Sequence, residues 1–288
     1  MATKRARRAV NASPKSWRST IGVIPAVLLV ALVVGGGLGT VALQSLGLMP
    51  LVGTPELSVD AYSALGDELW RSVALTLSIA VVSTALATVI GLTVALTALS
   101  GRRGALVAAG LTVSVPHLIG AAAMALLLAD SGMLARVLGV TDGGWPQVVG
   151  GPWWIAVVLE YAWKESGFVA VVVAGTLATR VAAYDESAAT LGAGRWARLR
   201  LITLPLARPA LIASAAISFA YTVGSYEVAR ILGRPYPEPL SVMAVRLFTS
   251  IDLASRPQAA AAATIAAALT IVVATAALHF LRRSAAWK

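Results

Sequence analysis

Six long apolar runs constrain what this chain can fold into more than any other feature of its sequence. Each has the roughly 20 residues that a helix needs to cross the hydrocarbon core of a bilayer at about 1.5 Å per residue. A helix also satisfies its own backbone hydrogen bonds, which lipid cannot do. Composition agrees, because 58% of the residues are hydrophobic and only 12% are charged. We expect an all-α polytopic membrane protein with about six transmembrane helices, near 21–46, 70–99, 105–129, 153–178, 209–230 and 258–281.

Basic residues gather in four groups that fall on one side of a six-span arrangement. Cytoplasmic loops of membrane proteins carry an excess of Lys and Arg, so this side is the cytoplasm and both termini lie inside. The formal net charge of +10 is then a matter of membrane orientation, and no nucleic-acid partner is expected. The groups are Lys4, Arg5, Arg7, Arg8, Lys15 and Arg18; Arg102 and Arg103; Arg180, Arg195, Arg198, Arg200 and Arg208; and Arg282, Arg283 and Lys288.

The same pattern divides the chain into a basic cytoplasmic tail (1–20), a membrane domain (21–283) and a second cytoplasmic tail (284–288). A signal peptide is the alternative for the N-terminus, because a basic stretch precedes an apolar one. The apolar run is longer than such a signal requires and lacks a clear cleavage site of small residues, so a retained helix is expected. Its glycine cluster at 35–37 either permits a close helix contact or marks a kink.

A polar and basic island separates the fourth and fifth runs. Residues 186–191 suit a short helix, and Gly192 and Gly194 permit the left-handed or close-packed backbone that stops it. Residues 196–204 suit a second helix, which Pro205 is expected to break near the membrane face. The sequence therefore predicts two short helices at an angle.

The spacing within this island resembles the coupling-helix (EAA) loop of permeases in ATP-binding cassette (ABC) importers of the binding-protein-dependent, type I, MetI-like superfamily. In that loop a Glu-Ala-Ala triplet is followed by Gly six positions after the Glu, and by Ile-x-Leu-Pro near the end. A basic loop that only orients the protein is the alternative, but it leaves the fixed spacing unexplained. The resemblance implies a docking loop at 180–208 for an ATPase, with Glu186, Ser187, Ala188, Ala189, Gly192, Ile202, Leu204 and Pro205 as its docking residues.

Two further stretches, 163–168 and 224–236, look like permeases of the polyamine, ferric iron, thiamine and phosphonate importer group. With the docking loop, the resemblance covers approximately residues 70–281. It implies a permease subunit that forms the solute path. The implied partners are ABC ATPase subunits, a second permease (a different chain or an identical one), an extracytoplasmic solute-binding protein and the lipid bilayer.

Several catalytic and nucleotide-binding motifs do not occur in the sequence. No Gly-x-x-x-x-Gly-Lys-Ser/Thr phosphate loop is present, so ATP and Mg²⁺ are expected on a partner ATPase and no cofactor on this chain. The chain has no cysteine, and its polar residues form no recognised catalytic or metal-binding motif. We therefore expect a transport subunit that is not an enzyme, with no catalytic or metal-binding residues.

Charged residues inside the fourth run are the next candidates. Glu160 and Lys164 have the i,i+4 spacing that places them on one helix face, with Glu165 beside them. A charge at the bilayer centre costs about 2.5 kcal/mol or more, so each needs a partner or water. The group is either a salt bridge that fixes the helix or a polar lining of the solute path. Tyr226 and Glu227, at the outer end of the fifth run, pose the same choice with a possible role as a gate.

A secondary transporter or channel driven by an ion gradient is the alternative function, with intramembrane charges as coupling residues. It explains those charges but not the docking loop. His117, beside Pro116, is interpreted as a satisfied polar residue at a helix kink. The outer loop at 231–257 combines a proline-rich lead-in with a stretch, 240–251, that suits an interfacial helix, and it either caps the bundle or docks the solute receptor.

Overall fold

The computed structural model describes residues 17–140, 143–178 and 181–283, and all regular structure in that part of the chain is helical. Residues 1–16 and 284–288 of the two expected tails lie outside it, as does residue 180 of the docking loop. The expected all-α polytopic fold is confirmed. By length and composition, five helical stretches of the described residues can cross a membrane: Gly22–Ser45, Gly66–Leu99, His117–Val137, Arg195–Gly224 and Leu253–Arg283.

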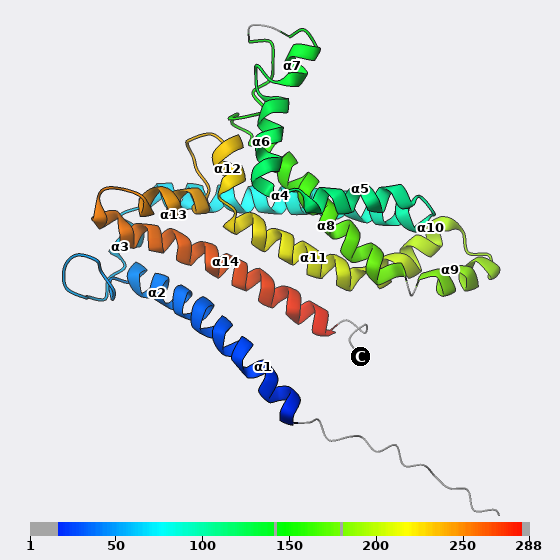
Figure 1. Cartoon of the computed structure of the whole chain (residues 1–288), viewed down its shortest axis with the longest axis horizontal. Coiled ribbons are helices and arrows are strands. Elements are labelled where there is room, and N and C mark those ends of the chain that lie inside the picture. Colours follow the sequence, from blue (N-terminus) through cyan, green and yellow to red (C-terminus); the bar gives the residue numbers. More distant parts are fainter. Residues whose placement is uncertain (1–16, 141–142, 179–180, 284–288) are drawn as a thin grey trace, which may run out of the picture.

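The first span consists of α1 (Trp17–Val30), a π-helical turn (Ala31–Gly35) and α2 (Gly36–Ser45). Helix α2 packs along α14 (Arg256–Arg283), as Figure 1 shows. A Cβ atom added at any glycine of the 35–37 cluster would meet nothing within 4 Å. The cluster therefore makes no close contact within this chain, and it marks the helix irregularity instead.

Helices α4 (Gly66–Leu99) and α8 (Ile155–Ala178) form the central pair of the bundle. They approach closely because Gly91 has no side chain: a Cβ atom there would lie 2.6 Å from Cβ of Val169. Gly167 gives α5 (Arg103–Ser114) the same access to α8, where an added Cβ would lie 2.9 Å from the backbone oxygen of Ala109. Small residues at helix crossings allow this packing in a membrane, where water provides no driving force.

The third expected span, 105–129, is wrong as a single helix. Helix α5 ends at Ser114, and α6 (His117–Leu128) begins after an extended Val115 and Pro116. Pro116 lacks an N–H and disfavours helical geometry at the residue before it, so the helix breaks there. Figure 1 shows α6 leaving the bundle at a steep angle, with α7 (Met133–Val137) at its far end.

The boundaries of the fifth expected span are also corrected. Pro205 does not break a helix: α10 (Arg195–Arg198), a π-helical turn (Leu199–Thr203) and α11 (Leu204–Gly224) run on without interruption. Pro205 lies in the first turn after the π-helical turn, where the hydrogen-bond pattern has already changed, so its missing N–H is tolerated. The helix ends at Gly224 instead of continuing to 230.

The outer loop and the docking loop occupy opposite ends of the bundle (Figure 1). One end carries α3 (Asp60–Ser63) and α13 (Leu240–Phe248), and α12 (Glu227–Leu232) lies near α13. The expected helix in the outer loop is therefore present as α13, although it packs on α14 through buried Leu240 and Met243. The other end carries α9 (Val181–Thr190) and α10, together with the C-terminal end of α14. A 3₁₀ turn at Leu253–Ser255 leads into α14.

Candidate functional site

The docking loop forms two short helices joined by a sharp turn at Gly192. Gly192 adopts φ +83°, a left-handed conformation that a side chain disfavours. Its N–H donates to the carbonyl of Ala189 at 3.0 Å, and the N–H of Ala193 donates to that of Ala188 at 3.0 Å. These two bonds constitute a Schellman motif at the end of α9. Gly194 is not left-handed: it has φ −65° and ψ 161°, and it precedes α10.

An ion pair holds the two short helices at their angle. Arg198 Nη1 of α10 donates to Asp185 Oδ2 of α9 at 2.6 Å. Both side chains are partly exposed, so the pair contributes about 0–1 kcal/mol of stability. Its main consequence is geometric, because it fixes the direction of α9 relative to the long helix that α10 begins.

The outward surface of the docking loop is more apolar than the sequence analysis foresaw. Tyr184, Leu191 and Trp196 are 59%, 88% and 75% exposed. Large apolar side chains in an otherwise polar and basic island were a readable signal, because contiguous exposed apolar surface marks interaction sites. The predicted docking residues Glu186, Ser187, Ala189 and Pro205 are also exposed, whereas Ala188, Ile202 and Leu204 are half-buried.

A second candidate site lies inside the bundle on one helical turn of α8. Glu160 is fully buried, and Lys164 and Glu165 are 4% and 7% exposed. His117, at the start of α6, reaches both carboxylates: its Nδ1 lies 3.3 Å from Glu160 Oε1 and its Nε2 lies 3.4 Å from Glu165 Oε1. His117 is therefore the partner of these carboxylates, a role that the sequence did not assign.

Lys164 does not pair with Glu160. Among the described residues no ion pair joins them, so the structure does not support the salt-bridge alternative for this pair. Lys164 Nζ donates instead to the backbone carbonyl of Thr112, at 2.5 Å, and to that of Val115. Pro116 cannot donate to the carbonyl of Thr112 as a residue in a continuous helix would, and the ammonium group takes that place. Lys164 thus stabilises the break between α5 and α6.

The polar cluster, which we define as His117, Glu160, Lys164 and Glu165, extends to α11. Ser218 Oγ donates to Glu165 Oε2 at 2.6 Å. The ring of Tyr221 lies over that of His117, with centroids 4.3 Å apart. A cavity of about 220 Å³ opens between these side chains and Phe168, Ile217 and Val113. Four helices, α5, α6, α8 and α11, therefore meet at one polar position with room for water or a small solute group.

Burial of Glu160 is energetically costly. Neither of its oxygens has an aligned hydrogen bond to the described residues, so its contact with His117 is electrostatic. Gly120 of α6 makes room for it, because a Cβ atom there would lie 2.9 Å from Glu160 Oε1. A buried carboxylate with incomplete partners is costly and marks a functional position more often than a structural one.

Tyr226 and Glu227 do not belong to the polar cluster. Tyr226 precedes α12 and lines a different pocket, at the α13 end of the bundle, and Glu227 is exposed in the first turn of α12. The five residues expected along a solute path are thus divided between two positions: Glu160, Lys164 and Glu165 lie on α8, and Tyr226 and Glu227 lie at the start of α12.

Comparison with protein families supports the loop assignment. The family described as "Binding-protein-dependent transport system inner membrane component" matches residues 87–286, which include both the docking loop and the polar cluster. The match covers well over half of the chain. The family match supports the expected ABC permease and not the alternative of an ion-coupled transporter.

Curated relatives of the chain are also permease proteins of transport systems. The molybdenum transport system permease protein ModB of Azotobacter vinelandii is 38% identical over 74 residues, which are 26% of this chain and 33% of that protein. The sulfate transport system permease protein CysT of Escherichia coli is 27% identical over 120 residues, 42% of this chain and 43% of that protein. The putative 2-aminoethylphosphonate transport system permease protein PhnV of Salmonella choleraesuis is 28% identical over 142 residues, which are 49% of this chain and 51% of that protein. The matches thus span about a third to a half of these relatives.

Solved structures share the fold over most of the chain. A bacterial alginate ABC transporter in complex with an alginate pentasaccharide-bound periplasmic protein contains a chain with a TM-score of 0.74 at 20% identity, covering 93% of this chain and 94% of that one. The MetNI methionine ABC transporter in an inward-facing conformation gives 0.58 at 18% identity, covering 78% and 98%. At these identities the likeness concerns the fold. Together with the matching family, it shows that this multi-pass chain belongs to the inner membrane components of binding-protein-dependent transport systems.

Proposed function

We propose that the chain is the permease subunit of an ATP-driven ABC importer and that α9 and α10 dock a separate ATPase. The observation that carries the proposal is the docking loop: two short helices fixed by Gly192 and by the Asp185–Arg198 pair, with apolar side chains exposed at the tip of the bundle. A rigid, exposed element of this kind can transmit the movement of a partner to the bundle as a rigid body.

The proposal assigns the remaining partners by position. A second permease completes the path, and a solute-binding protein meets the end that carries α12 and α13. The alginate transporter, whose structure includes a periplasmic binding protein, is the precedent among the fold neighbours. ATP and Mg²⁺ belong to the ATPase, and this chain needs no cofactor of its own. The solute path runs past the polar cluster and its cavity of about 220 Å³, where four helices meet.

Site-specific cross-linking tests the docking assignment. Leu191→Cys introduces a thiol at an 88% exposed position of the docking loop, and a bifunctional reagent should join it to the ATPase that co-purifies with the chain. Ile251→Cys, fully exposed at the other end of the bundle, is the matched control and should give no such product. Uptake into vesicles should require ATP inside them. Uptake driven by an ion gradient alone, with no ATPase product from Leu191→Cys, would establish the alternative function.

The same two variants test the orientation, in which both termini and the docking loop are cytoplasmic. In intact spheroplasts, an impermeant maleimide should label Ile251→Cys and leave Leu191→Cys unlabelled until the membrane is opened. Ser241 is unsuitable for this purpose, because it is 8% exposed and its hydroxyl donates to the carbonyl of Ser225 at 2.7 Å. The reverse labelling pattern would invert the assigned topology.

A further inference from the structure

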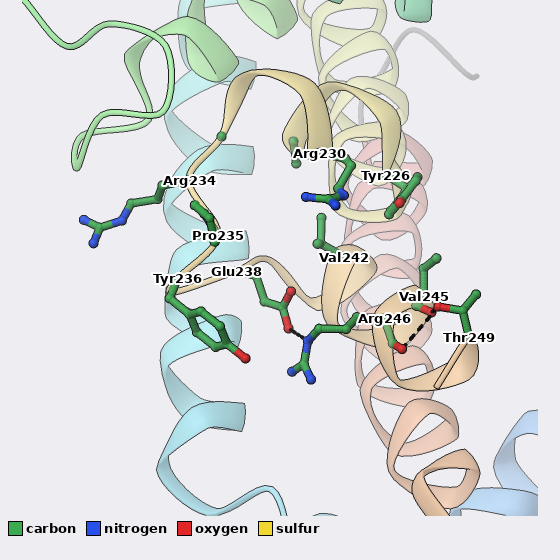
Figure 2. Close-up of a pocket in the computed structure, with 12 residues that line it drawn as sticks. Tyr226, Arg230, Arg234, Pro235, Tyr236, Glu238, Val242, Val245, Arg246 and Thr249 are labelled. Atoms are coloured by element: carbon green, nitrogen blue, oxygen red, sulfur yellow. Dashed lines mark hydrogen bonds and ion pairs between the residues drawn. The ribbon is translucent and has the colours of Figure 1, made fainter. Parts of the chain in front are cut away.

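A pocket of about 260 Å³ lies between α12, α13 and the segment that joins them (Figure 2). Three arginines and one glutamate contribute to its lining, and in Figure 2 Arg230 and Arg246 extend toward the pocket whereas Arg234 extends away from the other two. Two tyrosines complete the polar set. The residues are Tyr226, Arg230, Arg234, Tyr236, Glu238 and Arg246. Neither the docking loop nor the polar cluster contributes to this pocket.

The walls of the pocket are built firmly. Gly233 packs directly against Trp154, since a Cβ atom at Gly233 would lie 2.1 Å from the indole ring. The N–H of Gly150 donates to the carbonyl of Leu232 at 2.8 Å, which joins the end of α12 to the segment before α8. Val242 of α13 packs in the same buried cluster as Trp154. The pocket is therefore held in shape by the core and does not depend on a ligand to form.

Arg246 is fixed by carboxylates. Its Nε donates to Glu238 Oε1 at 2.6 Å, and its Nη2 donates to Glu68 Oε1 at 2.8 Å. Glu238 is 3% exposed, so a buried carboxylate orients the guanidinium group. In Figure 2 Arg246 extends from α13 on one side of the pocket and Arg230 from α12 on the other.

Arg230 and Arg234 differ from Arg246 in their acidic partners. No carboxylate of the described residues forms an ion pair with either of them. The carboxylate that lines the pocket, Glu238, is already bonded to Arg246. The pocket therefore presents an excess of positive charge, with guanidinium donors free to bind oxygen atoms in the forked geometry that suits oxyanions and carboxylates.

We infer that this pocket binds the oxyanion or carboxylate group of an anionic solute, chiefly through Arg230 and with Arg234 at its mouth. The inference rests on the proposed function, because the pocket lies at the end where a receptor would release solute. Its volume lies just below the roughly 300 Å³ at which pockets for larger organic ligands begin. One small anionic group therefore fits, and a larger solute would leave its remainder outside.

Protection from arginine modification tests the inference without requiring transport. The full chain, purified in lipid nanodiscs with the subunits that accompany it, is treated with phenylglyoxal and the modified arginines are quantified by mass spectrometry. Sulfate and 2-aminoethylphosphonate are the probes, at constant ionic strength set with chloride. At least one probe should slow modification of Arg230 and Arg234 and leave exposed Arg136 of α7 unchanged. Equal protection of Arg136, or protection by chloride alone, would reduce the effect to ionic screening and overturn the inference.

Substitutions measure how much Arg230 contributes to anion binding. Arg230→Gln should lower the affinity of the pocket for the protecting anion by about tenfold or more, because a charge-assisted hydrogen bond contributes roughly 1.5–3 kcal/mol. Arg136→Gln, the matched control, should leave the affinity unchanged. ATPase cross-linking through the docking loop should persist in both variants, so loss of anion binding is distinguishable from failure of the proposed function. If the solute receptor alone protects Arg230 when no anion is present, the pocket is a receptor contact and the inference is wrong.

The dependence of sulfate affinity on pH provides a second readout. Burial raises the pKa of Glu238 above its ordinary value, and the hydrogen bond from Arg246 opposes that shift only in part. The charged groups around Glu238 are Arg246, Glu68 and Arg230. As the pH falls through this raised pKa, Glu238 loses its negative charge and the pocket becomes more positive, so sulfate, which stays a dianion, should bind more tightly. In Glu238→Gln this gain should be present already at neutral pH. Sulfate affinity that stays constant with pH in both proteins would contradict the placement of the anion within reach of Glu238.

Discussion

A glutamate at position 192 is expected to uncouple the permease from its ATPase while leaving the chain in the membrane. Gly192 has φ +83° and donates one of the two hydrogen bonds of the turn after α9, and Ala193 donates the other. A residue with a side chain pays about 1–2 kcal/mol in that conformation, a factor of roughly 5–30 in the equilibrium between the native and the altered turn. The added carboxylate also changes the charge of the docking surface. ATPase association and solute-stimulated hydrolysis should fall together.

The neighbouring glycine provides the control for backbone strain. Gly194 has φ −65°, and neither glycine has an atom of the chain within 4 Å of an added Cβ. Gly192→Ala should therefore reduce stimulated ATPase activity, whereas Gly194→Ala should preserve it, because only the first substitution forces a left-handed backbone on alanine. Glu186→Lys tests the charge of the same surface without altering the turn. Normal assembly and full stimulated hydrolysis in Gly192→Glu and Glu186→Lys would refute the docking assignment.

Removal of His117 is expected to be the most destabilising single change within the bundle. Glu160 is fully buried, has no aligned hydrogen bond to the described residues, and lies 3.3 Å from His117 Nδ1. Removing one partner of a buried charge pair typically costs about 3–5 kcal/mol, because the other charge remains without compensation. His117→Leu should therefore lower the midpoint of thermal unfolding strongly. The double variant His117→Leu with Glu160→Gln should recover much of the loss.

A second cycle with Lys164 separates the two possible pairings. Lys164 donates to the carbonyls of Thr112 and Val115 and acts on Glu160 only through space, so the double change Glu160→Gln with Lys164→Met should recover less stability than the His117 and Glu160 double variant. Uptake measured on all of these variants adds the functional answer. If the His117 and Glu160 double variant regains stability but not uptake, the polar cluster serves the solute path. If instead the Glu160→Gln, Lys164→Met double variant regains stability and the His117→Leu, Glu160→Gln double variant does not, then the contacts in the structure do not account for the stability of the polar cluster.

The membrane class and the docking loop were readable from the sequence because each depends on local properties. Apolar length alone predicts a spanning helix, since lipid leaves the backbone no other partner. The turn at Gly192 was equally accessible, because a left-handed position after a helix is a preference of the residue itself. The exposed Leu191 and Trp196 carried a visible signal that was not used: large apolar side chains in a polar island.

Positions that depend on neighbouring helices were predicted less well. Pro205 looked like a helix terminator, but the π-helical turn before it lets α10 and α11 continue as one helix. Pro116 lies within an equally apolar run, yet there the helix breaks, and Lys164 from α8 supplies the donor that stabilises the broken end. The same residue type thus had opposite outcomes, and the difference lies in which groups can take over the lost hydrogen bond.

The sequence by itself determined that this chain crosses a membrane as helices and carries a two-helix loop between two of them, because apolar length and glycine placement act within a single segment. The tertiary structure alone decided the partners of the charges. Helical periodicity placed Glu160 and Lys164 on one face and left open whether they pair with each other, whereas the packing of α5 and α6 against α8 supplies His117 to Glu160 and gives Lys164 the carbonyl of Thr112 in α5. It also brought Arg230 and Arg246 to one pocket from two helices. Contacts between helices are set by crossing geometry and close approach at small residues, and neither is encoded in the spacing along one helix.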